Sequence, residues 1–212
     1  MHGPLAWRDR LIGTIDQGLR TLASHAPPAR SSPADALPEP SLTHDERRRS
    51  AALLRVNHAG EIAAQALYSG QALVARSEAT RAQLQAAASE EHDHLAWCAA
   101  RLRELGGRAS VLDPLWYVGS FCIGVVAGSS SDRSSLGFVA ETERQVEAHL
   151  QDHLERLPKG DRKSHAILSR MASDEAHHGT MASLAGGTPL PAPIRSCMSL
   201  GGGLLRRIAL FV

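Results

Sequence analysis

The feature that most constrains the fold of this chain is an arrangement of glutamate and histidine residues that occurs twice. In each half, a segment with helical periodicity carries a glutamate, and a Glu-x-x-His motif follows roughly thirty residues later. Because residues three apart on a helix share a face, each motif directs a carboxylate and an imidazole toward one point. The pattern predicts four long helices that turn these side chains toward a common interior. The side chains are Glu61, Glu91, His94, Glu143, Glu175 and His178.

This set of side chains has a recognisable chemistry. A glutamate from each of two helices, with Glu-x-x-His from each of the other two, is the ligand set of a ferritin-like di-iron or di-manganese bundle. Carboxylates buried without partners would lose their hydration and repel one another. Two divalent cations would balance the charge, and oxygen and nitrogen ligands suit both iron and manganese. The sequence therefore predicts an all-α, ferritin-like four-helix bundle around a two-metal centre.

Three glutamates compete for the ligand position in the third long helical segment. Glu143 has the spacing that matches the first half of the chain. Glu147 lies one helical turn beyond it, and Glu141 points away from the same face. We expect Glu143 to be the ligand, with the other two as ordinary surface charges.

Four more side chains are candidates for positions around the metals. Glu90 and Asp174 each precede a Glu-x-x-His motif, and each is expected to accept the free N–H of the histidine from the opposite half. Tyr68 lies two turns after the first ligand glutamate, where core packing or a role beside the metal would both fit. His149 is about 120° away from the face of the third ligand glutamate, so its spacing alone favours the surface.

Start and stop signals divide the chain into an N-terminal part, residues 1–43, and a bundle domain, residues 44–212. The N-terminal part combines an amphipathic helix with a linker, residues 25–42, that holds five of the eleven prolines and is expected to be flexible. Thr43 and Glu46 form a capping box at the start of the first long helix. The expected helices cover residues 5–23, 44–75, 78–105, 115–128, 132–157, 161–185 and 192–210.

The composition argues against several classes of function. Its 23 lysines and arginines against 22 aspartates and glutamates leave a formal charge of +1, so no global field favours nucleic acid as a partner. The three cysteines form no Cys-x-x-Cys pair, which argues against a zinc ribbon or a disulfide framework. The longest uncharged run, residues 114–131, has an apolar part of about fourteen residues, shorter than the roughly 20 that cross a bilayer. We therefore expect no transmembrane helix.

Four stretches of the sequence resemble the demethoxyubiquinone hydroxylase family of ubiquinone biosynthesis. They are Leu-Arg-Val-Asn-His-Ala-Gly-Glu at 54–61, Glu-His-Asp-His-Leu at 91–95, Pro-Leu-Trp at 114–116 and Asp-Glu-Ala-His-His at 174–178. The resemblance extends over about residues 44–212, and Asn-His-Ala-Gly-Glu is specific to that family. The family pattern places iron ligands at the same six residues, and it places a histidine near the substrate channel at His149.

The resemblance implies a ferritin-like di-iron hydroxylase domain with two iron ions per chain and O2 as co-substrate. The activity would be a monooxygenase reaction on the ring of 2-polyprenyl-3-methyl-6-methoxy-1,4-benzoquinol in ubiquinone biosynthesis. Other ubiquinone-biosynthesis proteins, or a second copy of the chain, are the candidate protein partners.

A polyprenyl substrate implies contact with a membrane surface. We expect a peripheral protein on the cytoplasmic face of the bacterial cell membrane, or on the mitochondrial inner membrane of a eukaryote. Residues 115–128 and 204–212 are the expected membrane-facing segments, with Arg206 and Arg207 near lipid headgroups.

Two alternatives remain open, the first of them on the same fold. The first is a ferritin-like protein that stores iron or acts as a peroxidase, although the chain lacks the paired cysteines of rubredoxin-bearing peroxidases. The second is a metal-free, lipid-binding helical bundle. Metal content and product analysis distinguish the three hypotheses.

Overall fold

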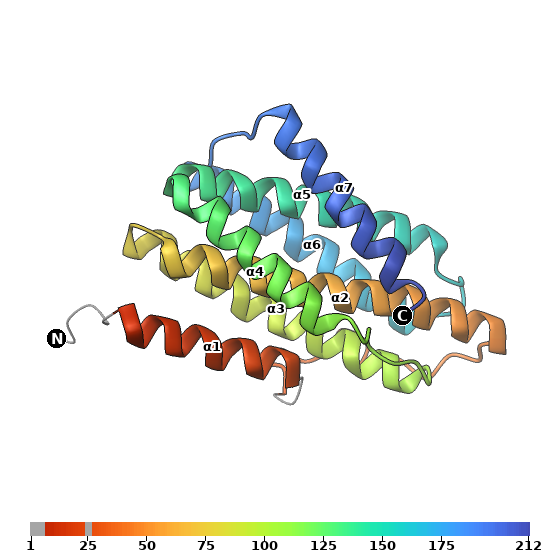
Figure 1. The fold of residues 1–212 in the computed structure, drawn as a ribbon. Coiled ribbons are helices and arrows are strands. Elements are labelled where there is room, and N and C mark those ends of the chain that lie inside the picture. Colours follow the sequence, from red (N-terminus) through yellow and green to blue (C-terminus); the bar gives the residue numbers. More distant parts are fainter. Residues whose placement is uncertain (1–6, 24–26) are drawn as a thin grey trace.

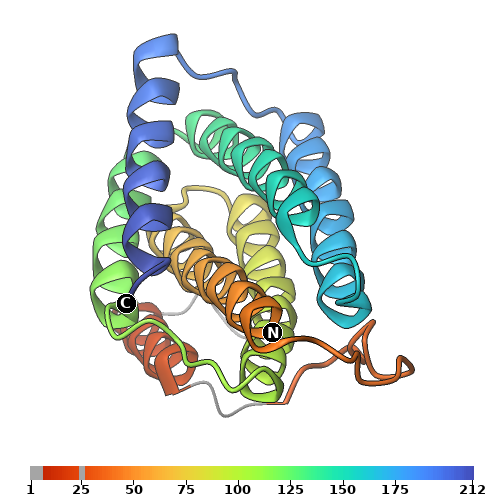
Figure 2. The same ribbon diagram turned by 90° about the vertical axis from the view of Figure 1, so that its right-hand side faces the viewer.

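The computed structural model describes residues 7–23 and 27–212, which form seven helices and no strand (Figure 1). The four long helices are α2 (His44–Val74), α3 (Glu78–Glu104), α5 (Asp132–Arg156) and α6 (Arg162–Leu184). The three shorter helices are α1 (Trp7–Ala23), α4 (Asp113–Ser130) and α7 (Ala192–Ala209). The α2–α3 pair faces the α5–α6 pair across the core, whereas α1, α4 and α7 lie outside α2 (Figure 2). The prediction of an all-α, ferritin-like bundle is confirmed.

Capping side chains explain where the long helices begin. At α2, the Glu46 N–H donates to Thr43 Oγ1 (3.3 Å), and the Thr43 N–H donates to a carboxylate oxygen of Glu46 (2.9 Å). This reciprocal pair is the predicted capping box. Ser77 caps α3, and Asp161 caps α6. The observed helix boundaries lie within two residues of the predicted ones, apart from residues 5 and 6, which are outside the described part of the chain.

Two apolar clusters fill the bundle on either side of the Glu/His positions. The first includes Leu54, Cys98 and Leu168, each 0% exposed. The second includes Leu84 and Val139, nearer the opposite ends of their helices. In each long helix the ligand-type residues lie between positions of these two clusters, so apolar layers flank the polar centre. Such layers exclude water and lower the local dielectric constant.

The α2 and α4 helices pack with their backbones in contact. A Cβ atom at Gly124 would lie 2.3 Å from the Leu67 carbonyl oxygen, and one at Gly70 would lie 2.3 Å from the Phe121 carbonyl oxygen. Since neither backbone oxygen can move away cheaply, both positions require glycine. Close packing against α2 thus places α4 along the outside of the bundle.

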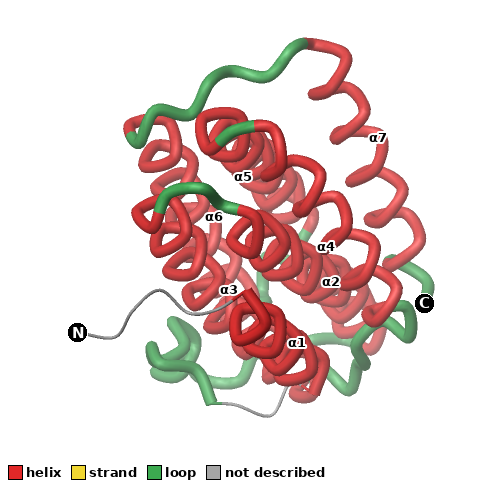
Figure 3. The backbone as a smooth tube through the Cα atoms, turned by 60° about the vertical axis from the view of Figure 1, so that its left-hand side comes forward, coloured by secondary structure: helices red, strands yellow, loops and turns green. Residues whose placement is uncertain are grey.

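The N-terminal segment differs from the predicted flexible linker. We call residues 27–43 the strap; it is a segment without helix or strand that leads to the start of α2 (Figure 3). Ala34 is 6% exposed and belongs to the first apolar cluster. Glu39 lies 3.0 Å from Arg101 and 2.9 Å from Lys163. The expectation of a flexible linker is therefore wrong for its described residues. Apolar contacts and ion pairs hold this segment against the bundle, and its prolines already restrict the backbone conformations that it can adopt. Residues 25 and 26 lie outside the described part.

Candidate metal centre

The six predicted ligand residues converge at the middle of the bundle. Glu61 comes from α2 and Glu143 from α5, while each Glu-x-x-His motif comes from α3 or α6. All six are buried, and His178, at 8%, is the most exposed. They form two overlapping groups in which the ligand atoms lie within 4.8 Å of one another. The groups are Glu61, Glu91, His94 and Glu175, and Glu91, Glu143, Glu175 and His178.

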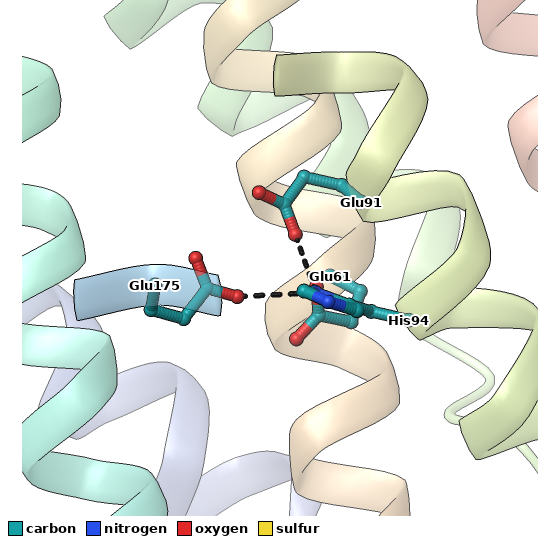
Figure 4. A group of neighbouring side chains, drawn as sticks. All are labelled: Glu61, Glu91, His94 and Glu175. Atoms are coloured by element: carbon teal, nitrogen blue, oxygen red, sulfur yellow. Dashed lines mark hydrogen bonds and ion pairs between the residues drawn. The ribbon is translucent and has the colours of Figure 1, made fainter. Parts of the chain in front are cut away.

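Both histidines turn the same ring nitrogen toward the two glutamates that the groups share. His94 Nδ1 lies 2.9 Å from Glu91 Oε2 and 3.1 Å from Glu175 Oε1 (Figure 4). His178 Nδ1 lies 3.3 Å from Glu91 Oε1 and 3.3 Å from Glu175 Oε2. Each shared carboxylate thus presents one oxygen to each histidine. This arrangement suits two neighbouring cations with Glu91 and Glu175 between them.

The outer ring nitrogens contact acids from the opposite helix pair. His94 Nε2 on α3 lies 3.0 Å from Asp174 Oδ2 on α6. His178 Nε2 on α6 lies 3.1 Å from Glu90 Oε2 on α3. An N–H donated from Nε2 to a carboxylate leaves Nδ1 as the metal-binding nitrogen and fixes the orientation of the ring. The structure therefore brings Glu90 and Asp174 to the positions expected from the sequence.

Burial and hydrogen bonding shift the pKa values of the ionisable groups of the centre in different directions. Burial raises the pKa of Glu61 and of Glu143 well above the usual carboxyl range. Burial acts in the same direction on Glu91, but hydrogen bonds from the two histidines outweigh it and lower the pKa of that carboxyl. For His94 and His178, burial acts to lower the pKa, but hydrogen bonds to carboxylates outweigh it. The pKa of His94 is thus raised well above its ordinary value, and that of His178 is raised to about 12.

The donor set fits a pair of hard or borderline cations. Glu61 Oε2 and Glu143 Oε1 are buried and make no hydrogen bond within the described structure, although Glu61 Oε2 lies 3.7 Å from His94 Nδ1. A buried oxygen without a partner costs about 1–3 kcal/mol, so these two oxygens indicate a cation that the side chains alone do not supply. The carboxylates and imidazoles match iron and manganese. Cys98 is not a competing ligand, because its thiol contacts Met171 Sδ at 3.7 Å and burial raises its pKa.

Comparison with known proteins identifies the family. The family model of the ubiquinone biosynthesis protein COQ7 matches residues 48–204. The chain belongs to the COQ7 family. A Cupriavidus taiwanensis relative is 58% identical over 192 residues, covering 90% of this chain and 93% of the relative. A Nitrosomonas eutropha relative is 55% identical over 204 residues, covering 96% and 98%. Both are named 3-demethoxyubiquinol 3-hydroxylase. The predicted resemblance to the demethoxyubiquinone hydroxylase family is confirmed.

The structure distinguishes the three glutamates of α5 that compete for the ligand position in this COQ7-family bundle. Glu143 is 1% exposed and lies in the second ligand group. Glu141 accepts hydrogen bonds from Arg144 (2.7 Å) and Gln145 (2.7 Å), which hold it outside that group. Glu147 belongs to neither ligand group. The geometry favours Glu143, in the register chosen from the sequence spacing.

Tyr68 and His149 lie outside both ligand groups. Tyr68 is 1% exposed within the second apolar cluster, and its hydroxyl has no hydrogen-bond partner among the described residues. His149 is partly buried and makes an edge-to-face contact with His153, with 3.9 Å between ring centroids. Burial, with the charges of His153 and Arg206, lowers the pKa of His149 to about 2. His149 is therefore neither a metal ligand nor a fully exposed residue, because with Ser199 and Arg206 of α7 it lines a surface cavity of about 310 Å³.

Sequence reasoning missed two buried or half-buried polar contacts, one between α2 and α4 and one between the strap and the acid behind His94. His58, inside the family motif, is 2% exposed, and its Nδ1 lies 3.3 Å from a carboxylate oxygen of Asp113 at the start of α4. The motif itself was the signal for this contact. Arg30 of the strap contacts Asp93 and Asp174, and no local pattern in a proline-rich segment indicates it.

Proposed function

We propose that this COQ7-family protein hydroxylates the ring of 3-demethoxyubiquinol, using two iron ions and O2. The names of the relatives supply the reaction and the substrate. The observation that carries the proposal for this chain is the convergence of six buried ligand-type side chains into two overlapping groups. When bound, two iron ions would supply the activation of O2 that ring hydroxylation requires.

The side chains of the centre would divide the work of holding the two cations. Glu91 and Glu175 lie in both ligand groups and would bridge the metals, while Glu61 and Glu143 would each serve one. Asp174 and Glu90 would each accept a hydrogen bond from the Nε2–H of a histidine, so that each imidazole directs its Nδ1 lone pair inward. The flanking apolar clusters exclude bulk water from the centre, which would protect its chemistry from competing reactions with water.

His149 is our candidate for contact with the quinol ring. It lines the cavity between α5 and α7 together with Arg206 and Ser199. Because its pKa is lowered to about 2, the imidazole is neutral at physiological pH and can both donate and accept a hydrogen bond. A neutral donor and acceptor suits the hydroxyl groups of a quinol.

A polyprenyl substrate requires access to lipid, and we assign this contact to the outer helices. Among the described residues, no helix combines the length and apolarity needed to cross a bilayer. The α1, α4 and α7 helices lie on one side of α2 (Figure 2) and carry exposed apolar side chains. These include Ile12, Leu19, Leu115, Val118, Ile123, Val126, Ile194, Leu200 and Leu204. An apolar face of this kind supports peripheral attachment to a membrane surface.

Basic side chains accompany this apolar face. Arg207 is exposed, as expected for contact with headgroups, whereas Arg206 is half-buried beside His149. Five more arginines line a surface cavity of about 680 Å³ next to Leu210 and Phe211: Arg48, Arg49, Arg55, Arg108 and Arg156. Arginine at the edge of an apolar surface favours anionic headgroups. We therefore propose the cytoplasmic face of the bacterial cell membrane as the place of action.

The test combines metal analysis with product analysis. Protein loaded anaerobically with Fe(II) should hold about two iron ions per chain. Incubation with a demethoxyquinol analogue, a reductant and labelled O2 should give a product with one added labelled oxygen. Iron binding without this product would favour storage, and less than about one iron per chain would refute the metal centre.

Substitution of ligands tests the assignment residue by residue. Glu91→Ala and His178→Ala should each abolish hydroxylation and lower the bound iron, since Glu91 lies in both ligand groups and His178 in one. A His44→Ala variant is a matched control, because His44 is an exposed histidine at the start of α2. Full activity in either ligand variant would overturn the assignment.

A further inference from the structure

Arg30 of the strap lies between two acidic residues on different helices. Its Nε is 2.7 Å from Asp93 Oδ2 on α3, and its Nη1 is 2.9 Å from Asp174 Oδ2 on α6. The guanidinium also lies over the Trp97 ring, 5.0 Å from the ring centroid, and the Trp97 indole N–H donates to the Arg30 carbonyl oxygen (3.2 Å). The backbone N–H of Ala29 donates to Asp93 Oδ1 (2.7 Å). This part of the strap is therefore fixed by contacts from both its side chain and its backbone.

The contact with Asp174 leads directly to a ligand residue. The same Asp174 oxygen that contacts Arg30 lies 3.0 Å from His94 Nε2. Arg170 also contacts Asp174 at 3.0 Å, but its side chain is 52% exposed, against 31% for Arg30. Since the screening of an ion pair falls with burial, Arg30 is the stronger of the two restraints on the carboxylate. A continuous series of contacts thus joins the strap to His94.

The other histidine lacks an equivalent restraint. His178 Nε2 contacts Glu90, whose side chain is 48% exposed against 10% for Asp174. Within the described part of the chain, Glu90 pairs with no lysine or arginine. The two halves of the centre therefore share their ligand types but differ in the support behind each histidine. The strap restrains the ligand group that contains His94. The group that contains His178 is instead supported, among the described residues, only by Glu90, whose side chain is exposed to solvent.

We propose that Arg30 is a positioning residue for the metal on the His94 side. Arg30 holds Asp174 in place, and Asp174 in turn fixes the orientation of the His94 ring. The inference rests on the metal centre of the proposed function. It follows that the two cations bind with unequal affinity, with the His94 side the tighter. Loss of a supporting residue behind a histidine ligand lowers metal affinity by about 10- to 100-fold. Arg30 lies one contact further from the metal than Asp174, so its replacement should weaken one of the two sites by about 10-fold, the lower end of this range.

The experiment is a titration of the full-length, metal-free protein with Co(II), followed by calorimetry and by the visible absorption of bound cobalt. Wild-type protein should show two equivalents of different affinity. Arg30→Met, which keeps the length of the side chain, should weaken the tighter equivalent by about 10-fold and alter its absorption band. The weaker equivalent should stay within about twofold of wild type, because the contacts of His178 do not involve the strap.

Three further variants separate the role of Arg30 from a general effect of the strap. Arg20→Met removes an exposed arginine that pairs with Asp16 one turn away, and it should bind cobalt as wild type does. Glu39→Gln weakens the strap at its other contact, with Arg101 and Lys163, and should also leave both equivalents unchanged. Arg30→Lys keeps the charge but cannot extend a planar fork to both acids, so a partial loss is expected. This milder variant keeps the test valid if Arg30→Met does not fold.

The outcomes distinguish this inference from the proposed function. Two equivalents of equal affinity in wild type, or an unchanged tighter equivalent in both Arg30 variants, would overturn the role of Arg30 and leave the metal centre intact. An equal loss in Arg30→Met and Glu39→Gln would also overturn it, because the strap would then act only as a cover. Failure of the wild-type protein to bind cobalt would refute the metal centre itself.

Discussion

Addition of a divalent cation to the metal-free protein near pH 7 should displace protons from four of the buried ligand residues. Burial raises the pKa of Glu61 and Glu143 well above the carboxyl range, which favours the protonated form of both carboxyl groups. His94 and His178 are expected to be imidazolium ions, because hydrogen bonds to carboxylates outweigh burial and raise the pKa of both, that of His178 to about 12. Each group must lose its proton before it can bind a metal ion.

The expected release is therefore about four protons for two cations. Two divalent cations carry the same total charge as the protons they displace, so the net charge of the buried centre does not change. This balance gives a physical reason why an apolar interior accepts both states. The figure of four applies where each of the four pKa values lies above the pH of the experiment.

Calorimetry in buffers of different ionisation enthalpy measures this number directly. The slope of the observed binding enthalpy against the buffer enthalpy gives the protons released per chain at saturation. Glu61→Gln is a matched variant that removes one titratable group and should release about one proton fewer. A release of about two protons or fewer in wild type would show that at least two of the four groups carry no proton without metal, and it would refute the charge distribution described above.

The remaining predictions concern stability. The pKa of His178 is raised to about 12, so its contribution to stability is fully present below the unfolded pKa of about 6.5 and declines as pH rises toward 12. The metal-free protein should therefore have a lower melting temperature at pH 9 than at pH 6. The melting temperature of the metal-loaded protein should change less between these pH values. Gly124→Ala should cost about 1–3 kcal/mol of unfolding free energy in urea denaturation, because the new Cβ would meet the α2 backbone. Gly201→Ala in α7, where a Cβ meets nothing, should be neutral or stabilising, and equal losses in the two glycine variants would contradict this account. Deletion of residues 1–42 should lower the melting temperature, because it exposes apolar surface of the bundle and removes the partner of Arg101, Glu39. An unchanged melting temperature would show that the strap adds no stability.

The sequence predicts the central part of this fold because its signals are local. The capping box of α2 involves residues three apart, and each Glu-x-x-His motif occupies one helical turn. The repeat of the motif in two helix pairs then requires that the pairs face each other for the carboxylates to share counterions. The choice of Glu143 over Glu141 and Glu147 needed no information beyond this repeat.

The features that the sequence did not predict depend on contacts between distant segments. Arg30 contacts residues 63 and 144 positions away, and a proline-rich segment has no periodicity that would indicate a buried face. His149 has the spacing of a surface residue on α5, yet α7, far along the chain, forms part of the cavity wall beside it. Spacing describes one helix at a time, and it does not say which later element packs against that helix.

The crossed pairing of each histidine with an acid from the other helix pair has a further consequence. Neither hairpin, α2–α3 or α5–α6, holds a complete set of ligands or the outer partner of its own histidine. The chain is thus organised as two incomplete halves that become competent only when docked. Any opening that separates the hairpins dismantles both metal positions together, so metal retention should report on the docking of the hairpins as a cooperative unit.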